Sequence, residues 1–333
     1  MNLRDPMAPS GVGGGAGTGP LAVVTITTGE LERSAELYRG LLGLGGERQA
    51  FAGHSGAALA ERWGVVPGLR EWGFIELTDP AFPDAVRLRL LPTSPDAPSR
   101  RPERETRFAG GLGIGVPTRD LQRINARMAA AGIESSVGVI SMAFPRDDGT
   151  SYEVGEAHYL MPDGVMLLGV DRGDLAQIGP IDAKRGHGGI AYSSIVTTDC
   201  ARLAVLLGEV LGLERRRACV LEAGGPQDGM RLPPGTQVQF EQWFAAGTTS
   251  NYLVVMEFAG VGLPAPTVTG GERGLSRWTF ATNDLDRCLS AARRVGVDVV
   301  DKAAEFALPG PLAQRLATIR TADGLMIELA ETA

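Results

Sequence analysis

The pattern of apolar and polar positions along the chain repeats four times. In each copy a run of strand-like apolar residues ends at an acidic or turn residue, and an amphipathic helix that closes at a glycine follows. In the first copy Leu31, Ala35, Tyr38 and Leu42 recur at spacings of three and four, which places one apolar stripe along a helix. The four copies occupy Leu21–Gly43, Gly111–Gly132, Ile190–Gly212 and Leu275–Gly296.

Each predicted helix has an acidic residue at its start, which can accept the free N–H groups of the first turn, and a glycine at its end. The acidic residues are Glu30, Asp120, Asp199 and Asp284. The closing glycine follows by 13 residues in copies one and three (43 − 30 and 212 − 199) and by 12 in copies two and four (132 − 120 and 296 − 284). The alternating intervals indicate that one half of the chain repeats the other.

Strand-like runs after each helix complete a unit of one strand, one helix and about three strands, whose sheet stays bare on one face until a second unit covers it. The periodicity lapses at Pro92–Arg107 and Arg172–Gly186, which we interpret as linkers. We expect an α+β fold of four βαβββ modules, paired into an N-terminal domain (21–174) and a C-terminal domain (187–331). A disordered Gly/Pro-rich tail (1–20) precedes them.

Composition narrows the classes of function. The net charge of −7 disfavours nucleic-acid binding, which depends on a basic face. No run approaches the roughly 20 apolar residues of a membrane span. The first residues lack the apolar core of a signal peptide, so we expect a cytoplasmic protein, with a homodimer left open. The three cysteines show no C-x-x-C spacing and are interpreted as reduced thiols.

Several motifs resemble one family. Leu21–Ile26 followed by Leu37–Leu44 is similar to the opening of a vicinal oxygen chelate module, as found in glyoxalases, bleomycin-resistance proteins and extradiol dioxygenases. Val210–Glu214 repeats the end of that motif in the third copy. The resemblance covers nearly the whole chain after the tail and implies the layout of the extradiol dioxygenases, four modules in two paired domains.

The resemblance also implies a divalent metal that binds two neighbouring oxygens of a substrate. Its ligands would come from each first strand, seven residues before the acidic helix start, and from a glutamate on a closing strand. The first-strand positions hold Val23, Gly113, Tyr192 and Arg277, and the closing positions of the second and fourth copies hold Leu168 and Glu328. One carboxylate makes a poor transition-metal site, which needs about three protein ligands. We therefore expect no cofactor, with iron or manganese bound through Glu328 as the alternative.

Tyr192, Arg277 and Glu328 take the positions that would hold the iron of an extradiol-type dioxygenase, so the resemblance predicts that they converge in one cavity. The guanidinium supplies positive charge and a bidentate fork, the tyrosine a hydrogen bond, and the glutamate a base. This predicts a metal-free acid/base site. The alternative is an internal Arg277–Glu328 ion pair in a closed pocket, with Tyr192 as packing.

Three further residues are candidates for substrate binding. His158 lies on a predicted strand, where it either faces a cavity or is a hydrogen-bonded strand histidine. Trp243 either walls an apolar pocket or packs in the core. Arg87 alternates with apolar neighbours and shares a strand face with Arg89, which makes that face an anion site or a solvated edge.

We therefore expect an enzyme for a small aromatic or carbonyl compound, a lyase or isomerase that uses metal-free acid/base chemistry. The first alternative is a metal-dependent extradiol-type dioxygenase or glyoxalase with atypical ligands. The second is a non-catalytic protein that binds a drug or metabolite, as resistance proteins do. If the site of Tyr192 is not used, His158 and Arg87 are the next residues to test.

Overall fold

The computed structural model describes residues 17–51, 53–65, 72–101, 107–146, 148–223, 229–263, 271–300, 304–305 and 315–331. Residues 1–16 of the expected tail therefore lie outside the described residues. Residues 17–20, expected to be disordered, are bound to the fold, because the amide of Thr18 donates to Leu211 and that of Gly19 to Ala281. No described helix is long and apolar enough to cross a membrane.

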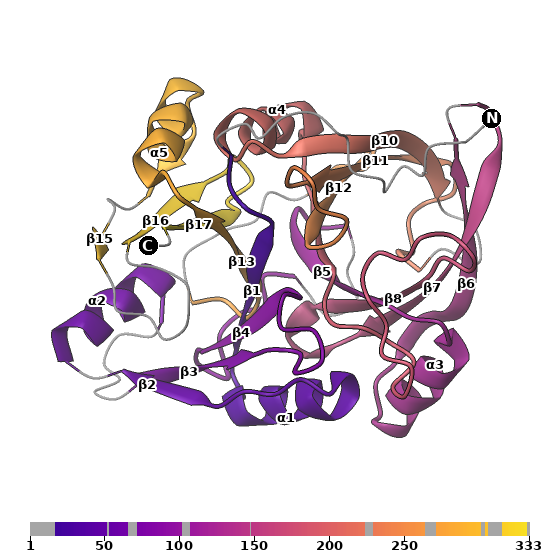
Figure 1. The fold of residues 1–333 in the computed structure, drawn as a ribbon, viewed down its shortest axis with the longest axis horizontal. Coiled ribbons are helices and arrows are strands. Elements are labelled where there is room, and N and C mark those ends of the chain that lie inside the picture. The colour runs from indigo at the N-terminus through magenta and orange to yellow at the C-terminus, as the bar shows by residue number, and fades with distance from the viewer. Residues whose placement is uncertain are drawn as a thin grey trace.

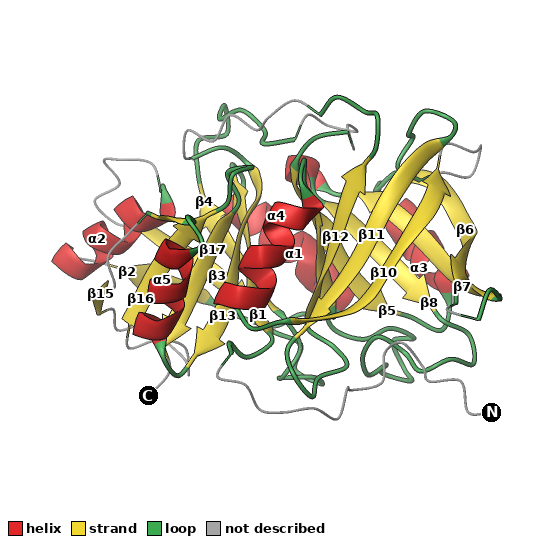
Figure 2. Cartoon of the chain, turned by 90° about the horizontal axis from the view of Figure 1, so that it is seen from above, coloured by secondary structure: helices red, strands yellow, loops and turns green. Residues whose placement is uncertain are grey.

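The strands form two curled sheets that lie side by side (Figures 1 and 2). The first sheet runs in the order β14-β16-β17-β13-β1-β4-β3-β2, with β15 beside β16. Its strands are β1 (Leu21–Thr28), β2 (Arg48–Phe51), β3 (Trp72–Leu77), β4 (Arg87–Pro92), β13 (Gly274–Thr282), β14 (Asp298–Val299), β15 (Ala304–Glu305), β16 (Arg315–Arg320) and β17 (Met326–Glu331). Because it combines the first and fourth modules, we call it the 1/4 sheet.

The second sheet combines the second and third modules, and we call it the 2/3 sheet. It runs in the order β10-β11-β12-β9-β5-β8-β7-β6. Its strands are β5 (Gly110–Pro117), β6 (Ser135–Pro145), β7 (Ser151–Leu160), β8 (Met166–Asp171), β9 (Tyr192–Val196), β10 (Glu214–Ala223), β11 (Thr236–Phe244) and β12 (Tyr252–Phe258). The α+β class and the four βαβββ modules are confirmed.

The expected pairing of the modules is wrong. We predicted that the first would pair with the second and the third with the fourth, within 21–174 and 187–331. Instead β1 lies antiparallel to β13, and β5 lies antiparallel to β9. The physical reason is that all four first strands present a similar free edge. The sequence repeat therefore locates each module but does not show which first strand pairs with which. That choice depends on tertiary contacts between modules.

The helices of the four repeats begin and end close to the predicted residues, whereas the helix at Gly53–Trp63 was not predicted. They are α1 (Leu31–Leu42), α2 (Gly53–Trp63), α3 (Leu121–Ala130), α4 (Cys200–Val205) with a π-helical turn (Leu206–Val210), and α5 (Leu285–Arg294), besides a 3₁₀ turn at Pro162–Gly164. Asp120, Asp199 and Asp284 each accept the backbone N–H three residues on. Glu30 caps nothing and instead pairs with Arg33 at 2.9 Å. The closing glycines all adopt the left-handed conformation, with φ between 69° and 73°.

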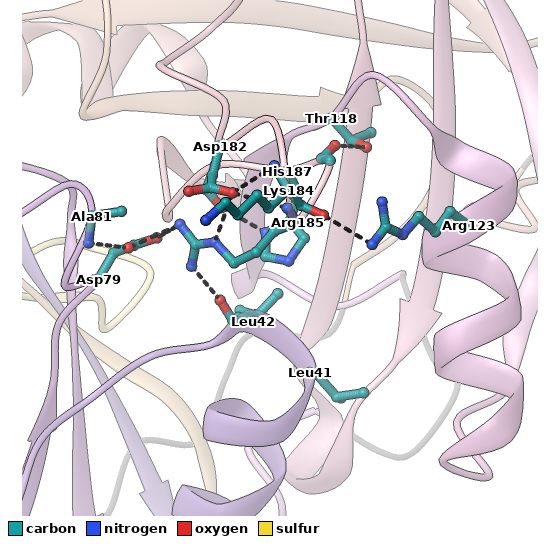
Figure 3. A network of polar contacts seen from close by, with 12 residues as sticks. Leu41, Leu42, Asp79, Ala81, Thr118, Arg123, Asp182, Lys184, Arg185 and His187 are labelled. Carbon is teal, nitrogen blue, oxygen red and sulfur yellow. Dashed lines mark hydrogen bonds and ion pairs between the residues drawn. The ribbon is translucent and has the colours of Figure 1, made fainter.

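A polar network fixes the linker between the second and third modules to the end of α1 (Figure 3). Arg185 pairs with Asp79 at 2.9 Å and donates to the carbonyl of Leu42 at 3.0 Å. The Nε2 atom of His187 lies 3.1 Å from a donor nitrogen of Arg127, and its Nδ1 lies 3.0 Å from the carbonyl of Gly188. His187 is thus a buried linker residue, and burial lowers its pKa below 6.5.

Candidate functional site

The three residues that were expected to converge lie in two different sheets. Arg277 on β13 and Glu328 on β17 belong to the 1/4 sheet, whereas Tyr192 on β9 belongs to the 2/3 sheet. The prediction that they share one cavity is wrong, because it assumed that the third and fourth modules pair.

In the 1/4 sheet the counterpart of Glu328 is a residue that bears the opposite charge. Thr25 on β1 is in register with Arg89 on β4, and Thr279 on β13 is in register with Glu328 on β17. Arg89 therefore occupies in the first module the position that Glu328 occupies in the fourth. The two side chains meet across the sheet, with Nη1 of Arg89 at 3.0 Å from Oε1 of Glu328.

Both oxygens of Glu328 already have protein donors. Thr279 and Arg89 donate to Oε1, each at 3.0 Å, while the indole of Trp63 donates to Oε2 at 2.7 Å and Arg277 lies 3.8 Å from it. Burial alone would raise the pKa of Glu328, but the guanidinium groups of Arg89 and Arg277 and the hydrogen bonds hold that pKa below its usual value. The carboxylate is therefore a fully paired anion and a poor base.

The same network includes the predicted anion site. Arg87 pairs with Glu76 at 2.7 Å, and Arg89 pairs with the other oxygen of Glu76 at 3.1 Å. The guanidinium of Arg89 also lies 4.5 Å from the ring centroid of Trp63. Arg87 is thus neither a free anion site nor a solvated edge. The expectation that it binds substrate is not supported, because its charge is balanced inside the protein.

The metal that the resemblance implies does not fit either sheet. In the register of the strands, the ligand positions are Val23, Arg89, Arg277 and Glu328 in the 1/4 sheet and Gly113, Leu168, Tyr192 and Val254 in the 2/3 sheet. Each set offers a single oxygen ligand, and the first places two guanidinium groups beside it, which repel a cation. Elsewhere in the described part of the chain, no three His, Cys, Asp or Glu side chains are grouped as a metal site.

A cavity of about 820 Å³ lies on the concave face of the 2/3 sheet. Alternate residues of the inner strands β8, β9, β11 and β12 line it, as strand geometry requires, whereas the edge strands β6 and β10 contribute consecutive residues. On β7 these are Tyr152, Val154, Glu156 and His158. The opposite walls come mainly from Leu168, Val170, Tyr192, Ser194, Phe240, Gln242, Tyr252, Val254 and Met256.

Two stacked tyrosine rings, Tyr192 and Tyr252, form part of one wall of this cavity, and Phe244 stacks against Tyr252 outside the lining. Tyr252 lies 5.2 Å from Tyr192 and 4.3 Å from Phe244, between ring centroids. The ring of Tyr192 lies over Gly115 on the neighbouring strand, where an added Cβ would overlap it. Gly115 therefore gives the ring of Tyr192 room to lie over β5. Tyr192 lines the cavity and also packs in the apolar cluster around it.

Polar and charged side chains also line the cavity, among them Glu156, His158 and Arg172. His158 is 1% exposed, and its Nε2 lies 2.8 Å from Oε2 of Glu156. The Nδ1 atom of His158 and the Oε1 atom of Gln242 are buried without a hydrogen-bond partner in the described structure. Both interpretations of His158 hold, since it faces the cavity and is hydrogen-bonded. Gly229 covers Nδ1 closely, so that an added Cβ would collide with the imidazole.

Arg217 joins the two edge strands of the 2/3 sheet. It donates to the hydroxyl of Tyr152 and, at 3.2 Å, to the carbonyl of Pro145, which links β10 to the β6–β7 hairpin. Its guanidinium lies 4.6 Å from the ring centroid of Phe144 and 6.0 Å from that of Phe240. The sheet is thus held nearly closed around the cavity by stacking and hydrogen bonds.

Trp243 lies on the other face of β11. It packs in the core beneath the helices, and its indole donates to Glu241 at 2.9 Å. Of the two interpretations of Trp243, core packing is therefore the one that holds. Neighbouring residues of a strand point to opposite faces, and because Gln242 faces the cavity, Trp243 faces away from it. Sequence reasoning also missed Glu156, although its spacing of two from His158 was a usable signal.

No family model matches the sequence, and no curated protein sequence matches it significantly. Among solved structures, glyoxalase I from Zea mays is similar in fold, at 14% identity over 94% of this chain and 92% of that chain, with a TM-score of 0.58. A predicted dioxygenase from Bacillus subtilis strain 168 matches at 15% identity over 96% of this chain and 86% of that chain, also with a TM-score of 0.58. At such identities the likeness concerns the fold alone, and it shows that this chain has the vicinal oxygen chelate fold.

Proposed function

We propose that the protein binds a small aromatic organic molecule in the cavity of the 2/3 sheet. The observation that carries this proposal is the cavity itself. Its volume of about 820 Å³ lies within the range of roughly 300–1,000 Å³ that is usual for small-molecule sites. Its walls are mostly apolar and aromatic, and its polar groups include acceptors without a partner in the described structure.

The other sheet is a weaker candidate. A ligand that approached Glu328 would have to displace Trp63, Arg89 or Thr279, and each displacement would leave a buried polar group unpaired. This network supports the interpretation of Arg277 and Glu328 as an internal ion pair. Because the metal positions do not fit a metal, we do not propose a metal-dependent dioxygenase or glyoxalase.

Propylbenzene, an apolar aromatic probe, tests the proposal by saturation-transfer NMR. Val254→Phe places a ring inside the cavity and should abolish binding, whereas Val205→Phe, at a position that is 41% exposed on α4, should leave it intact. Overpacking costs roughly 1–3 kcal/mol, so circular dichroism must show that both variants are folded. Equal binding by folded Val254→Phe and the parent would contradict the proposal.

Acid/base turnover of the bound molecule, of the lyase or isomerase kind, is the second candidate function. One observation favours it over a purely sequestering protein of the resistance type. A cavity that only holds an apolar molecule needs no titratable side chains, yet Glu156, His158 and Tyr192 all line this one. Turnover of a molecule that co-purifies with the protein would distinguish the two.

A further inference from the structure

Glu156 presents one available carboxylate oxygen to the cavity. It lies on β7, with a side chain that is 12% exposed. Its Oε2 is held by Nε2 of His158 at 2.8 Å, and a carboxylate can only accept, so the imidazole donates. Its Oε1 makes no hydrogen bond with any other residue that the structure describes. One oxygen is therefore fixed by the protein, and the other belongs to a side chain that lines the cavity and has no described hydrogen-bond partner.

Tyr192 supplies a hydrogen-bond donor to the same space. Its ring lies over Gly115, and its hydroxyl donates to no group in the described structure. Burial raises the pKa of Tyr192 well above 10, and the nearby charge of Glu156 raises it further. The phenol thus stays protonated at neutral pH. The strand register places both side chains on the same face: Tyr192 is in register with Gly115, Gly115 with Leu168, and Leu168 with His158, two residues from Glu156.

A carboxylate acceptor and a protonated phenol that line one mostly apolar cavity suit the removal of a proton from carbon. A carbon beside a carbonyl group becomes acidic when a base removes its proton while a donor stabilises the oxygen that gains charge. Both groups act more strongly where the low polarity of the surroundings excludes water. Neither group needs a metal for this task.

We propose that Glu156 and Tyr192 form a proton-transfer site for a small aromatic ligand that carries an enolisable carbonyl group, with His158 as a positioning residue. The inference rests on the proposed function, since it needs the ligand to occupy the 2/3 sheet cavity. It names Glu156, which the sequence did not suggest, as the base in place of Glu328.

The step balances without an oxidant or reductant. Oε1 of Glu156 takes the proton from the carbon next to the carbonyl. The electron pair of the broken C–H bond forms a C=C bond, and the carbonyl π pair moves to oxygen, which accepts the hydrogen bond of Tyr192. Return of the proton to the same carbon gives exchange, and return to a conjugated carbon gives an isomer.

Phenylacetone tests this step, because its benzylic protons can be followed by proton NMR in deuterated water. The parent protein should exchange them faster than buffer does. Glu156→Gln should still bind the ketone but lose about 10²- to 10⁴-fold in exchange rate. Tyr192→Phe should lose about 10²- to 10³-fold, as expected for one oxyanion donor. Glu153→Gln, an exposed carboxylate on the same strand, is the matched control and should exchange like the parent.

The positioning role of His158 needs its own measurement. His158→Gln keeps an N–H donor for Glu156, whereas His158→Leu removes it. We expect both variants to bind propylbenzene, and the glutamine variant to exchange phenylacetone at least ten-fold faster than the leucine variant. Equal rates in the two folded variants would reduce His158 to a packing residue and overturn this part of the proposal.

Propylbenzene separates failure of this inference from failure of the proposed function. If propylbenzene and phenylacetone both bind, but exchange is no faster than in buffer or is unchanged in Glu156→Gln, the proton-transfer site is refuted and the binding function stands. If neither probe binds the parent protein, the proposed function fails, and this inference fails with it.

Discussion

The buried carboxylate of Glu328 allows the sharpest test of how the two sheets divide their roles. The sequence suggested that Glu328 acts as a base, and on that hypothesis Glu328→Gln would spare binding and reduce turnover. The structure leads to a different expectation, because Glu328 is fully buried and each of its two oxygens accepts a hydrogen bond from the protein. We now expect Glu328→Gln to lower the free energy of unfolding and to leave ligand binding unchanged.

The size of the expected loss in the free energy of unfolding follows from the hydrogen bonds to Glu328. The amide nitrogen of glutamine must replace either Oε1, which accepts from Arg89 and Thr279, or Oε2, which accepts from Trp63. In either orientation the amide N–H group of the glutamine points at a donor of the protein. Arg89 also loses one of its two carboxylate partners and keeps only Glu76. Removal of one member of a buried pair costs about 3–5 kcal/mol. We expect a loss of this size at neutral pH.

The pH dependence has a defined sign. Arg89 and Arg277 outweigh burial and depress the folded-state pKa of Glu328 below the value of 4.5 that the unfolded chain has. The unfolded state therefore binds a proton more readily, so the stabilisation is fully present above pH 4.5 and is lost as pH falls through the folded pKa. The difference between the parent and Glu328→Gln should shrink only in acid.

Urea unfolding followed by circular dichroism measures this effect, with Asp298→Asn as the control. Asp298 pairs with Arg320 at 2.6 Å, but both side chains are largely exposed, and such pairs contribute about 0.2–1 kcal/mol. If Glu328→Gln costs no more than Asp298→Asn, the ion network is not stabilising. If the folded variant no longer binds propylbenzene, the 1/4 sheet takes part in binding after all.

Three further changes test other parts of the structure. Gly115→Ala should displace the ring of Tyr192 and weaken propylbenzene binding, as measured by saturation-transfer NMR. Burial lowers the pKa of His187, so stability to urea should be constant above pH 6.5 and fall as pH decreases below it, and His187→Gln should flatten that slope. Trp243→Phe should cost about 1–3 kcal/mol of stability by leaving Glu241 short of a donor, yet bind propylbenzene like the parent, because Trp243 faces away from the cavity.

The local elements could be predicted because their signals are short in range. An acidic residue and a glycine 12 or 13 positions apart fix where a helix starts and stops, as Asp120 with Gly132 shows. The partner of each module could not be predicted, since β1 and β9 offer equivalent edges to β13 and β5. That choice depends on contacts between residues about 250 positions apart, such as the hydrogen bond from Thr27 to Ser276.

The site was mispredicted for the same reason. Tyr192 and Arg277 occupy equivalent positions of their modules, and only the pairing decides whether they meet. The strand pattern was more reliable within a module. Alternation on β7 places Glu156 and His158 on one face, so the identification of His158 as a cavity residue could have led directly to Glu156.

A comparison of the two sheets explains why similar modules produce a closed core in one and an open cavity in the other. In the 1/4 sheet the closing strands contribute Arg89 and Glu328, and opposite charges at symmetry-related positions attract across the concave face. In the 2/3 sheet the equivalent positions hold Leu168 and Val254, which cannot bridge that space with an ion pair. The charge pair fills one sheet and stabilises it, while the short apolar pair leaves room for a ligand in the other.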